Sequence, residues 1–366
     1  MKVLKILLIL MGSVILAAGC TPAEQPPPPP IENDYPLAVQ GTIAEFFPFH
    51  ENSLVTFERT DMFGSDTSFA IHIDGNRMQR ITTLGDFRAI EVFEIADGEL
   101  RVNHASMTAS VAENLLDKID DTPMVILREP LVVGNSWETH TGPTVQGVAR
   151  GVTTITAVDV EIETPYGNVV AIEVATEFEN GYWEVNYFAR DLGLVQSGYF
   201  IQGFEREGDS GRFFQEDMTV DRTLRSITEN TSFNMDFVVV HPNDNADDLE
   251  LSEASFTIIT NGDQVEVLRG AFEATLRNPG GREYGVISPN TSINFININR
   301  EPTDQSPFEA AAVHLDLSAH FSEDMAVGIS FEQLILTSLE LTFLEFFNAQ
   351  EFILTVENQP HISIHG

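Results

Sequence analysis

The chain has 366 residues, 43% of them hydrophobic and 9% aromatic, so it can bury sizeable cores and exceeds one ordinary domain. Its 56 acidic residues outnumber 19 basic ones and give a formal net charge of -37. Such a charge repels nucleic acid and anionic lipid headgroups. We interpret the acidic excess as an adaptation for solubility in a salty or alkaline medium. A surface for a cationic partner is the less favoured explanation. The single cysteine excludes internal disulfides and thiolate metal clusters.

Residues 1–19 are typical of a signal peptide. Two lysines precede an apolar run from Ile6 to Leu16, which is too short for a good transmembrane span. The run ends in Ala17-Ala18-Gly19-Cys20, which resembles the lipobox of bacterial lipoproteins, although the usual leucine lies one position early. The resemblance implies cleavage before Cys20 and attachment of lipid, with acyl chains such as palmitate, to Cys20. We therefore expect an extracytoplasmic protein anchored to the cell membrane by this lipid.

Residues 20–39 follow as a proline-rich tether. Pro26–Pro30 are consecutive prolines, which adopt an extended polyproline II form of roughly 3 Å per residue. A stiff spacer of this kind would lift the folded part off the bilayer. A docking site for a proline-reading domain is the less favoured alternative.

Residues 40–205 alternate between apolar and polar side chains, which predicts strands. Tight-turn sequences separate these runs, as at Asp74-Gly75-Asn76, Asp97-Gly98 and Asn180-Gly181. We predict an antiparallel β domain, either a curved sheet or an open barrel, with one helix around Ala109–Ile119.

Three stretches of this domain, 129–137, 164–168 and 187–195, resemble a β-rich module found in bacterial envelope proteins. The resemblance supports the fold and implies no activity. Trp137 and Pro130 are interpreted as core and turn residues.

Five phenylalanines near the start of the domain raise the alternative that a curved sheet encloses a lipid, as LolA-type carriers do. Simple filling of a core is the favoured explanation for them. These residues are Phe46, Phe47, Phe49, Phe57 and Phe69.

Residues 206–234 lose the alternation and are predicted to be a linker, and residues 235–366 to form a second domain. Asp263 with Glu266 is a capping box that predicts a helix, and Ser330 opens a longer one that runs to about Phe347. With strands between them, the predicted order is β-β-α-β-β-α-β in one mixed sheet carrying both helices. The whole chain is therefore predicted to be α+β.

The stretches 312–321 and 348–358, with Thr342 on the intervening helix, resemble the GerMN domain of sporulation and spore-germination lipoproteins. The resemblance implies an extracytoplasmic module that acts by binding and assembly at the envelope, with an envelope protein or peptidoglycan as partner. It supplies no catalytic residues. The family's closing glycine is replaced near Asn358, which leaves a ligand-facing role of that loop open.

No catalytic, cofactor-binding or metal site is predicted, and each candidate has a simpler explanation. An acidic loop could bind calcium but lacks EF-hand spacing, so a solvated turn is favoured. His314 and His320 lack a third zinc ligand. Glu161 and Glu163 share the solvent face of one strand, unlike a glycosidase pair. The acidic loop contains Asp244, Asp247, Asp248 and Glu250.

Gly208-Asp209-Ser210-Gly211 matches the serine-protease nucleophile loop by letters alone. That chemistry also needs a base histidine, a supporting acid and an oxyanion hole, for which the sequence gives no signature. A polar turn explains these residues.

Together these observations predict a non-enzymatic cell-envelope lipoprotein that acts as a binding or assembly module in sporulation or spore germination. The alternative is a carrier or sensor of an apolar ligand in the first domain. An envelope hydrolase using paired carboxylates has no motif behind it.

Overall fold

The computed structural model describes residues 38–60, 64–84, 87–106, 111–140, 149–200, 219–282, 285–299, 310–325 and 329–361. The expected signal peptide and most of the tether, including Cys20, lie outside these residues. The described part belongs to one compact unit, Pro36–Gly366. Within it, no helix has the length and apolar character needed to cross a membrane.

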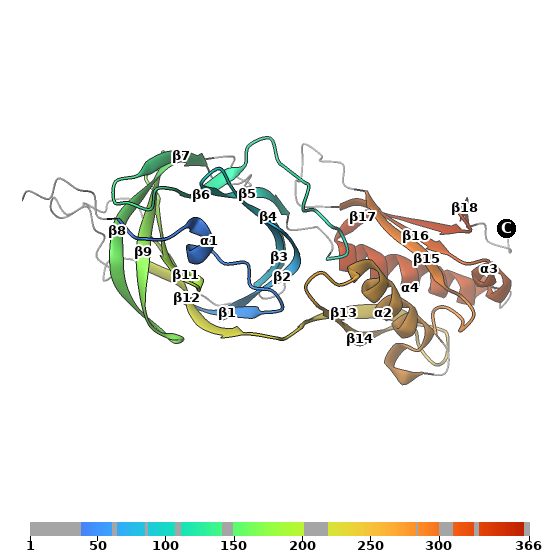
Figure 1. The fold of residues 1–366 in the computed structure, drawn as a ribbon. Coiled ribbons are helices and arrows are strands. Elements are labelled where there is room, and N and C mark those ends of the chain that lie inside the picture. Colours follow the sequence, from blue (N-terminus) through green and yellow to red (C-terminus); the bar gives the residue numbers. More distant parts are fainter. Residues whose placement is uncertain are drawn as a thin grey trace, which may run out of the picture. The chain divides into compact units, whose positions relative to one another are not determined.

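The first half of the chain forms a single twelve-stranded sheet with the order β6-β5-β4-β3-β2-β1-β12-β11-β10-β9-β8-β7, antiparallel at every pairing (Figure 1). The chain therefore runs as two meanders that join where β12 pairs with β1. The strands are β1 (Leu54–Arg59), β2 (Ser65–Asp74), β3 (Arg77–Leu84), β4 (Phe87–Ala96), β5 (Glu99–Ser106), β6 (Met124–Arg128), β7 (Ser136–His140), β8 (Arg150–Thr164), β9 (Gly167–Phe178), β10 (Trp183–Ala189), β11 (Gly193–Phe200) and β12 (Thr219–Thr228).

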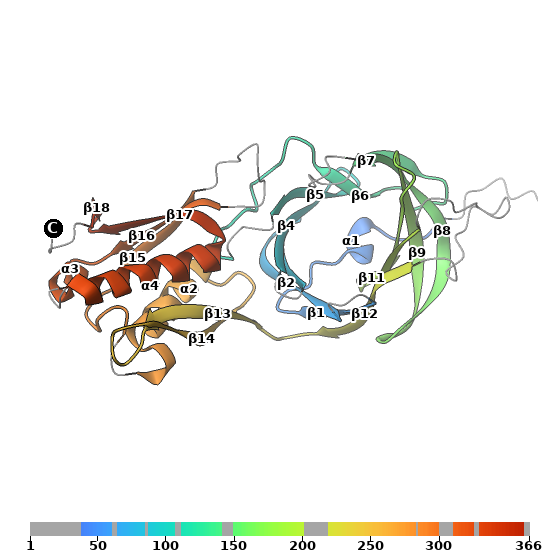
Figure 2. The ribbon, with the colours of Figure 1, turned by 180° about the vertical axis from the view of Figure 1, so that it is seen from behind.

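The sheet is nearly closed because its two edge strands, β6 and β7, come together. Side chains join them: Trp137 Nε1 donates to the Val125 carbonyl at 3.1 Å, and Thr139 Oγ1 donates to the same oxygen at 3.2 Å. The curved sheet surrounds the short helix α1 (Ile43–Phe46) (Figure 2). Ile43 and Phe46 belong to an apolar cluster inside the curved sheet. The predicted antiparallel β architecture is thus confirmed.

The predicted helix around Ala109–Ile119 is wrong over its described part, since residues 111–119 form turns and irregular chain. A buried glutamine on β3 explains the difference. Gln79 Nε2 donates to the Glu113 carbonyl at 2.7 Å, and the Leu115 N–H donates to Gln79 Oε1 at 2.6 Å. The Gln79 amide thus forms hydrogen bonds with backbone groups that would pair with each other in a helix.

The predicted linker, residues 206–234, differs from the structure as well. Its described part contains β12, which pairs with both β1 and β11 and so completes the sheet. Arginines on this strand obscure the alternation that would have revealed it. Residues 201–218, which include the Gly208–Gly211 stretch, lie outside the described residues.

The second half of the chain contains two sheets, where one mixed sheet was predicted. β13 and β14 pair only with each other, whereas the other sheet has the order β15-β16-β17-β18 with β16 and β17 parallel. The elements are β13 (Phe233–Pro242), β14 (Leu249–Ile258), α2 (Gln264–Arg277), η2 (Pro279–Gly281), β15 (Ile293–Asn299), β16 (Ala310–Leu317), α3 (His320–Asp324), α4 (Ile329–Phe347), β17 (Ala349–Val356) and β18 (Gln359–Pro360).

Helix α4 explains why the sheets stay separate, because it covers the edge of β13 (Figure 2). The buried Thr342 hydroxyl accepts a hydrogen bond from the Val240 N–H at 2.9 Å. This N–H lies at the edge of the sheet and could otherwise pair with a further strand. A helix side chain is its hydrogen-bond acceptor instead.

The two halves share a hydrophobic core. The outward side chains of β2 to β4, such as Phe69 and Ile81, belong to the same buried cluster as Phe272 of α2. Phe69 also stacks on Phe233 with ring centroids 5.9 Å apart. The described side chains on the inward face of the same strands do not take part in this shared core and make contacts inside the curved sheet.

Candidate functional site

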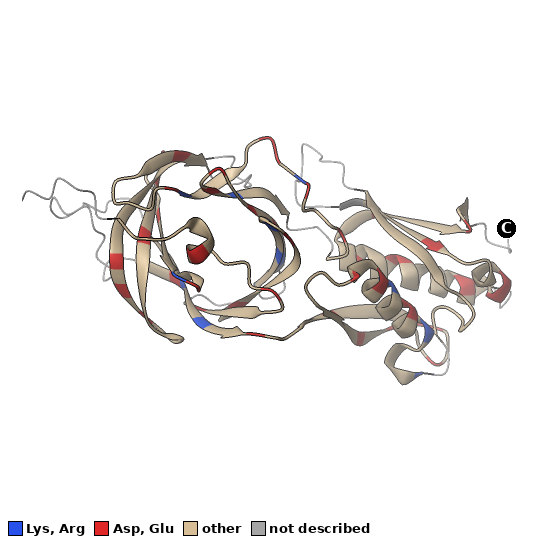
Figure 3. Cartoon of the chain, viewed as in Figure 1, with Lys and Arg blue, Asp and Glu red and all other residues tan. Residues whose placement is uncertain are grey.

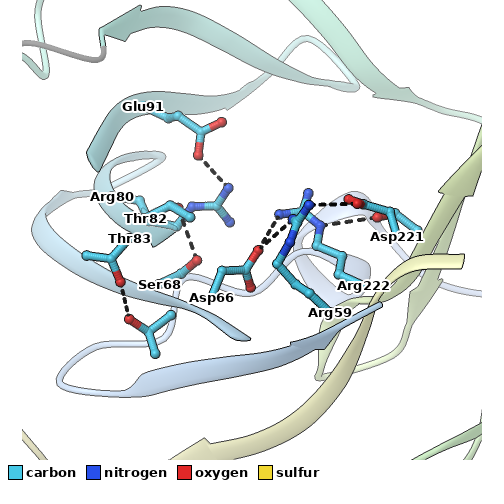
Figure 4. A network of polar contacts seen from close by, with 11 residues as sticks. Arg59, Asp66, Ser68, Arg80, Thr82, Thr83, Glu91, Asp221 and Arg222 are labelled. Carbon is cyan, nitrogen blue, oxygen red and sulfur yellow. Dashed lines mark hydrogen bonds and ion pairs between the residues drawn. The ribbon is translucent and has the colours of Figure 1, made fainter. Parts of the chain in front are cut away.

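The inward face of β1 to β4 and β12 carries charged and hydroxyl side chains that meet inside the curved sheet (Figure 4). Arg80 on β3 lies opposite Glu91 on β4, and its Nη2 donates to Glu91 Oε2 at 2.7 Å. Ser68 and Thr82, also opposite each other, are 3.1 Å apart between their hydroxyl oxygens. Antiparallel register therefore builds the site, since paired residues point to the same face.

Asp66 is the most deeply buried member of this network, with 2% of its surface exposed. One carboxylate oxygen lies 3.4 Å from Arg59 Nη1 and 3.6 Å from Arg222 Nη1, and Arg59 Nη2 also bonds Asp221 at 2.7 Å. The other oxygen of Asp66 has no hydrogen-bond partner among the described residues. Burial raises the pKa of Asp66, against the opposing charges of Arg222 and Arg59.

Aromatic rings hold the guanidinium groups in place. Arg80 Cζ lies 4.4 Å from the centre of the Phe93 ring, and Arg222 Cζ lies 5.4 Å from that of Phe57. Burial alone would raise the pKa of Glu91, but the charge and hydrogen bond of Arg80 outweigh it and hold that pKa below its ordinary value. Glu91 is therefore ionised and paired at neutral pH.

Two cavities lie beside Arg80. The larger, called here the main cavity, has a volume of about 160 Å³, and the smaller, the minor cavity, about 50 Å³. For scale, a cavity of about 150 Å³ holds benzene, whereas pockets for drug-sized ligands span about 300–1,000 Å³. The main cavity is lined by apolar and polar side chains in similar number, among them Phe93, Phe178, Phe188, Arg80, Glu184 and Asn186.

Three aromatic residues in contact, called here the aromatic rim, include Phe178 of the main cavity. Tyr182 lies between Phe178 and Tyr199, with ring centroids 5.9 Å and 5.8 Å away. Partial burial, with the nearby charges of Glu184 and Asp221, raises the pKa of Tyr182 to about 12. Tyr182 therefore keeps its hydroxyl proton, and 37% of its surface remains exposed.

Chemically, this arrangement is suited to binding. Its carboxylates are engaged by arginine or amide groups, as when Asn186 Nδ2 donates to Glu184 Oε1 at 2.8 Å. Among the described residues, no three His, Cys, Asp or Glu side chains are grouped so that they could hold a metal ion. Acidic side chains elsewhere are spread over both halves of the chain (Figure 3).

The five phenylalanines considered for lipid binding are divided among three clusters. Phe46 and Phe47 belong to the interior of the curved sheet, with Phe49 packed against it, whereas Phe57 lies in a neighbouring cluster. Phe69 faces the second half of the chain. Only Phe47 of the five lines the main cavity.

The other candidates singled out in the sequence are dispersed. Arg282 pairs with two carboxylates of the acidic loop, Asp244 at 3.2 Å and Glu250. His314 Nε2 contacts Thr355 Oγ1 at 2.8 Å, while the exposed His320 contacts its helix neighbour Glu323.

Glu161 and Glu163 are exposed, as predicted. Trp137 is 3% exposed and belongs to the core, and Pro130 lies in an exposed turn segment. Cys20, the predicted lipidation site, lies outside the described residues.

The residues of the main cavity were missed by sequence reasoning. The sequence pattern that could have identified them is a charged residue on the inward face of a strand. Arg80 is an example, because it shares one face of β3 with Met78 and Thr82. Such a charge looks like an ordinary surface residue until pairing with Glu91 shows which face it occupies.

Comparison with protein-family models finds no match, and comparison with curated proteins finds none. Among solved structures, the chain is similar to a Bacteroides fragilis protein described as a candidate exported protein with a YMCC-like fold. The identity is 13% and the TM-score 0.32, over 50% of this chain and 99% of that one. A candidate lipoprotein of Parabacteroides distasonis is similar at 10% identity and a TM-score of 0.28, over 50% and 98%. Similarity at this level assigns neither a family nor a function.

Proposed function

We propose that this chain is an exported lipoprotein that binds a small ligand in the main cavity and is anchored to the membrane by lipid on Cys20. The observation that carries the binding role is the arginine–carboxylate network, of which Arg80, Glu91 and Arg222 line that cavity. Buried ion pairs are weak contributors to stability, because desolvation offsets their attraction. A fold that needed only a core would be served as well by apolar residues, whereas perturbed titratable groups in a cavity are typical of functional sites.

A non-enzymatic role fits these contacts better than catalysis. A general acid or base needs a pKa near the working pH and a reacting partner within hydrogen-bond reach. The pKa of Glu91 is instead lowered by Arg80, which keeps the carboxylate ionised. Its hydrogen bond to Arg80 also fixes its position. We infer that the network orients a ligand without transforming it.

A cavity-filling variant tests the binding role. Val174 is buried and lines the main cavity, so Val174→Phe should occupy it, whereas Val170→Phe places the same ring on the same strand at a position that is 55% exposed. Native mass spectrometry of each protein, purified from its own cells, should show a bound small molecule for the wild type and Val170→Phe but none for Val174→Phe. A wild-type protein without any bound molecule would count against the role.

The anchor is tested by mass analysis and fractionation. We expect the mature protein to begin at an acylated Cys20 and to sediment with membranes. A Cys20→Ala variant should leave the membrane fraction while keeping its folded part. An unacylated Cys20 in the native mature protein would contradict the proposal.

The resemblance to GerMN domains supports a finer proposal, that the second half acts in assembly during sporulation or germination. It rests on the sequence pattern of 312–321 and 348–358 and on the envelope role which that family implies. Deleting the gene and scoring spore yield and germination tests it. Normal values for both would end this part of the proposal.

The alternative of an apolar-ligand carrier is supported by the interior position of the main cavity. Its volume of about 160 Å³ accommodates only a benzene-sized part of a lipid, however. Nearly half of its lining side chains are also polar, which an acyl chain would leave without partners. We therefore prefer a small ligand with polar groups.

A further inference from the structure

We infer that the ligand of the main cavity is neutral and rich in hydroxyl groups, namely a single sugar ring at the end of an envelope glycan. This inference rests on the proposed binding role and specifies the chemistry of the same site. Three observations carry it: the charge balance of the polar network, the mixture of fixed donors and acceptors, and the aromatic rings beside them.

The charges of the network balance. Two arginines, Arg80 and Arg222, and two carboxylates, Glu91 and Glu184, line the main cavity. Each of the two guanidinium groups has a carboxylate partner in the network, Glu91 for Arg80 and Asp66 for Arg222. An anionic ligand would have to compete with Asp66 and Glu91 for the arginines, and a cationic one would have to displace the arginines. A neutral ligand disturbs neither set.

The main cavity offers both donors and acceptors at fixed positions. Arg80 can only donate, and its buried Nε has no partner among the described residues. Glu184, when ionised, can only accept, while the amide of Asn186 does both. A hydroxyl group both donates and accepts, so a ring bearing several hydroxyls can satisfy these side chains together. A carboxylate ligand would serve only the donors.

The aromatic residues supply the remaining surface. Phe93 and Phe188 line the main cavity, and sugar rings present apolar C–H faces that pack on such rings. A volume of about 160 Å³ admits a single six-membered ring. Because there is room for one ring, the remaining sugars of the glycan would lie outside the main cavity, which is why we infer the end of a glycan and not its middle.

Ligand-observed NMR on the full chain in detergent tests this inference. The probes are the methyl glycosides of glucose, galactose, mannose and N-acetylglucosamine. Glucuronic acid serves as the charged comparator and dodecanoate as the apolar one. We expect at least one neutral glycoside to bind, and to bind at least tenfold more tightly than glucuronic acid and dodecanoate.

Two variants connect binding to the site. Asn186→Leu removes an amide from the cavity at similar size, and Arg80→Lys keeps the charge that Glu91 needs while removing the Nε donor. Each should weaken glycoside binding about tenfold, the effect of losing about 1.4 kcal/mol of hydrogen bonding. Asn290→Leu, at an exposed position of the second half, is the matched control and should leave binding unchanged.

The outcomes separate the inference from the proposed function. If glucuronic acid or dodecanoate binds more tightly than every neutral glycoside, with the Val174→Phe variant abolishing that binding, the inference is overturned and the binding cavity stands. Glycoside binding that Asn186→Leu and Arg80→Lys both leave intact also overturns it. If no probe of any class binds and the native protein carries no small molecule, both the inference and the proposed function fail.

Discussion

At the scale of single residues, Asp316 shows how one buried carboxylate can order a turn. It accepts hydrogen bonds from Asn294 Nδ2 at 2.8 Å, from the Asn358 N–H at 2.7 Å and from the Thr355 hydroxyl. Asn358 and Glu357, the tight turn between β17 and β18, both have positive φ, 61° and 51°. Asparagine tolerates this region better than most residues, which explains how the turn forms without the glycine of the GerMN pattern.

Replacing this carboxylate should lower stability in a pH-dependent way. Burial would raise the pKa of Asp316, but the hydrogen bonds from Thr355, Asn294 and Asn358 outweigh it and lower the pKa. The stabilisation is therefore present above the ordinary pKa of 3.8 and lost as the pH falls through the folded-state value. Asp316→Asn should cost about 1–3 kcal/mol in urea unfolding at pH 7. The difference should shrink below pH 4, while the exposed Asp236→Asn changes little; a cost that stays constant to low pH would contradict this account.

His50, which lines the minor cavity, should respond to pH in a higher range than Asp316. Burial lowers its pKa, opposed by a backbone hydrogen bond with Leu192 and by the charges of Glu229 and Asp191. Because the unfolded chain then binds a proton more readily, stability should decline as the pH falls below 6.5. His50→Gln should flatten the unfolding free energy between pH 6.5 and 5. The exposed His320→Gln is the control, and an unchanged slope for His50→Gln would refute the assignment.

At the scale of elements, the contact of α4 with β13 is the feature that separates the two sheets of the second half. Thr342→Val keeps the shape of the side chain but leaves the Val240 N–H without its acceptor. We expect a loss of about 1–2 kcal/mol in urea unfolding. Ser338→Ala is the control, because among the described residues that hydroxyl bonds only its own helix, at the Leu334 carbonyl 2.7 Å away. Equal effects of the two substitutions would show that the Val240 contact adds nothing.

Elements whose signals are local could be predicted from the sequence. The Asp97-Gly98 turn is an example, since both residues adopt the positive φ that the sequence predicts, 54° and 73°. The capping box at Asp263 likewise marks the start of α2, with the Asp263 side chain accepting from the Glu266 N–H. Local signals of this kind depend only on residues a few positions apart.

Features that depend on distant partners could not be predicted in this way. The segment 111–119 is irregular because Gln79, more than thirty positions away, binds its backbone. Strand β12 is recognisable only beside β1 and β11. The site follows the same rule, because Arg80 and Glu91 become a buried pair only once the register of β3 and β4 is known.

At the scale of the whole molecule, the shared core predicts that both halves unfold together. Thr260 reinforces this core: its hydroxyl accepts from the Asn52 N–H and donates to the Ala70 carbonyl, each at 2.8 Å. Trp137 and Trp183 lie in the curved sheet, and the long helices α2 and α4 in the second half. Tryptophan fluorescence and helical circular dichroism therefore report different halves.

We expect the two signals to change at the same urea concentration. Phe69→Ala, at the junction, should lower the free energy of unfolding reported by both signals by about 3–5 kcal/mol. Two separate transitions, or a shift in only one signal, would show that the halves are independent. That result would remove the reason for treating residues 36–366 as one unit.

The central claim, that the space inside the curved sheet is a ligand site, is tested most directly by a crystal structure of the protein purified from its own cells without added ligand. The account predicts electron density for a small ring in the main cavity, within hydrogen-bond distance of Arg80 and Asn186 and against Phe93. A cavity holding only ordered water, or one closed by its own side chains, would contradict it.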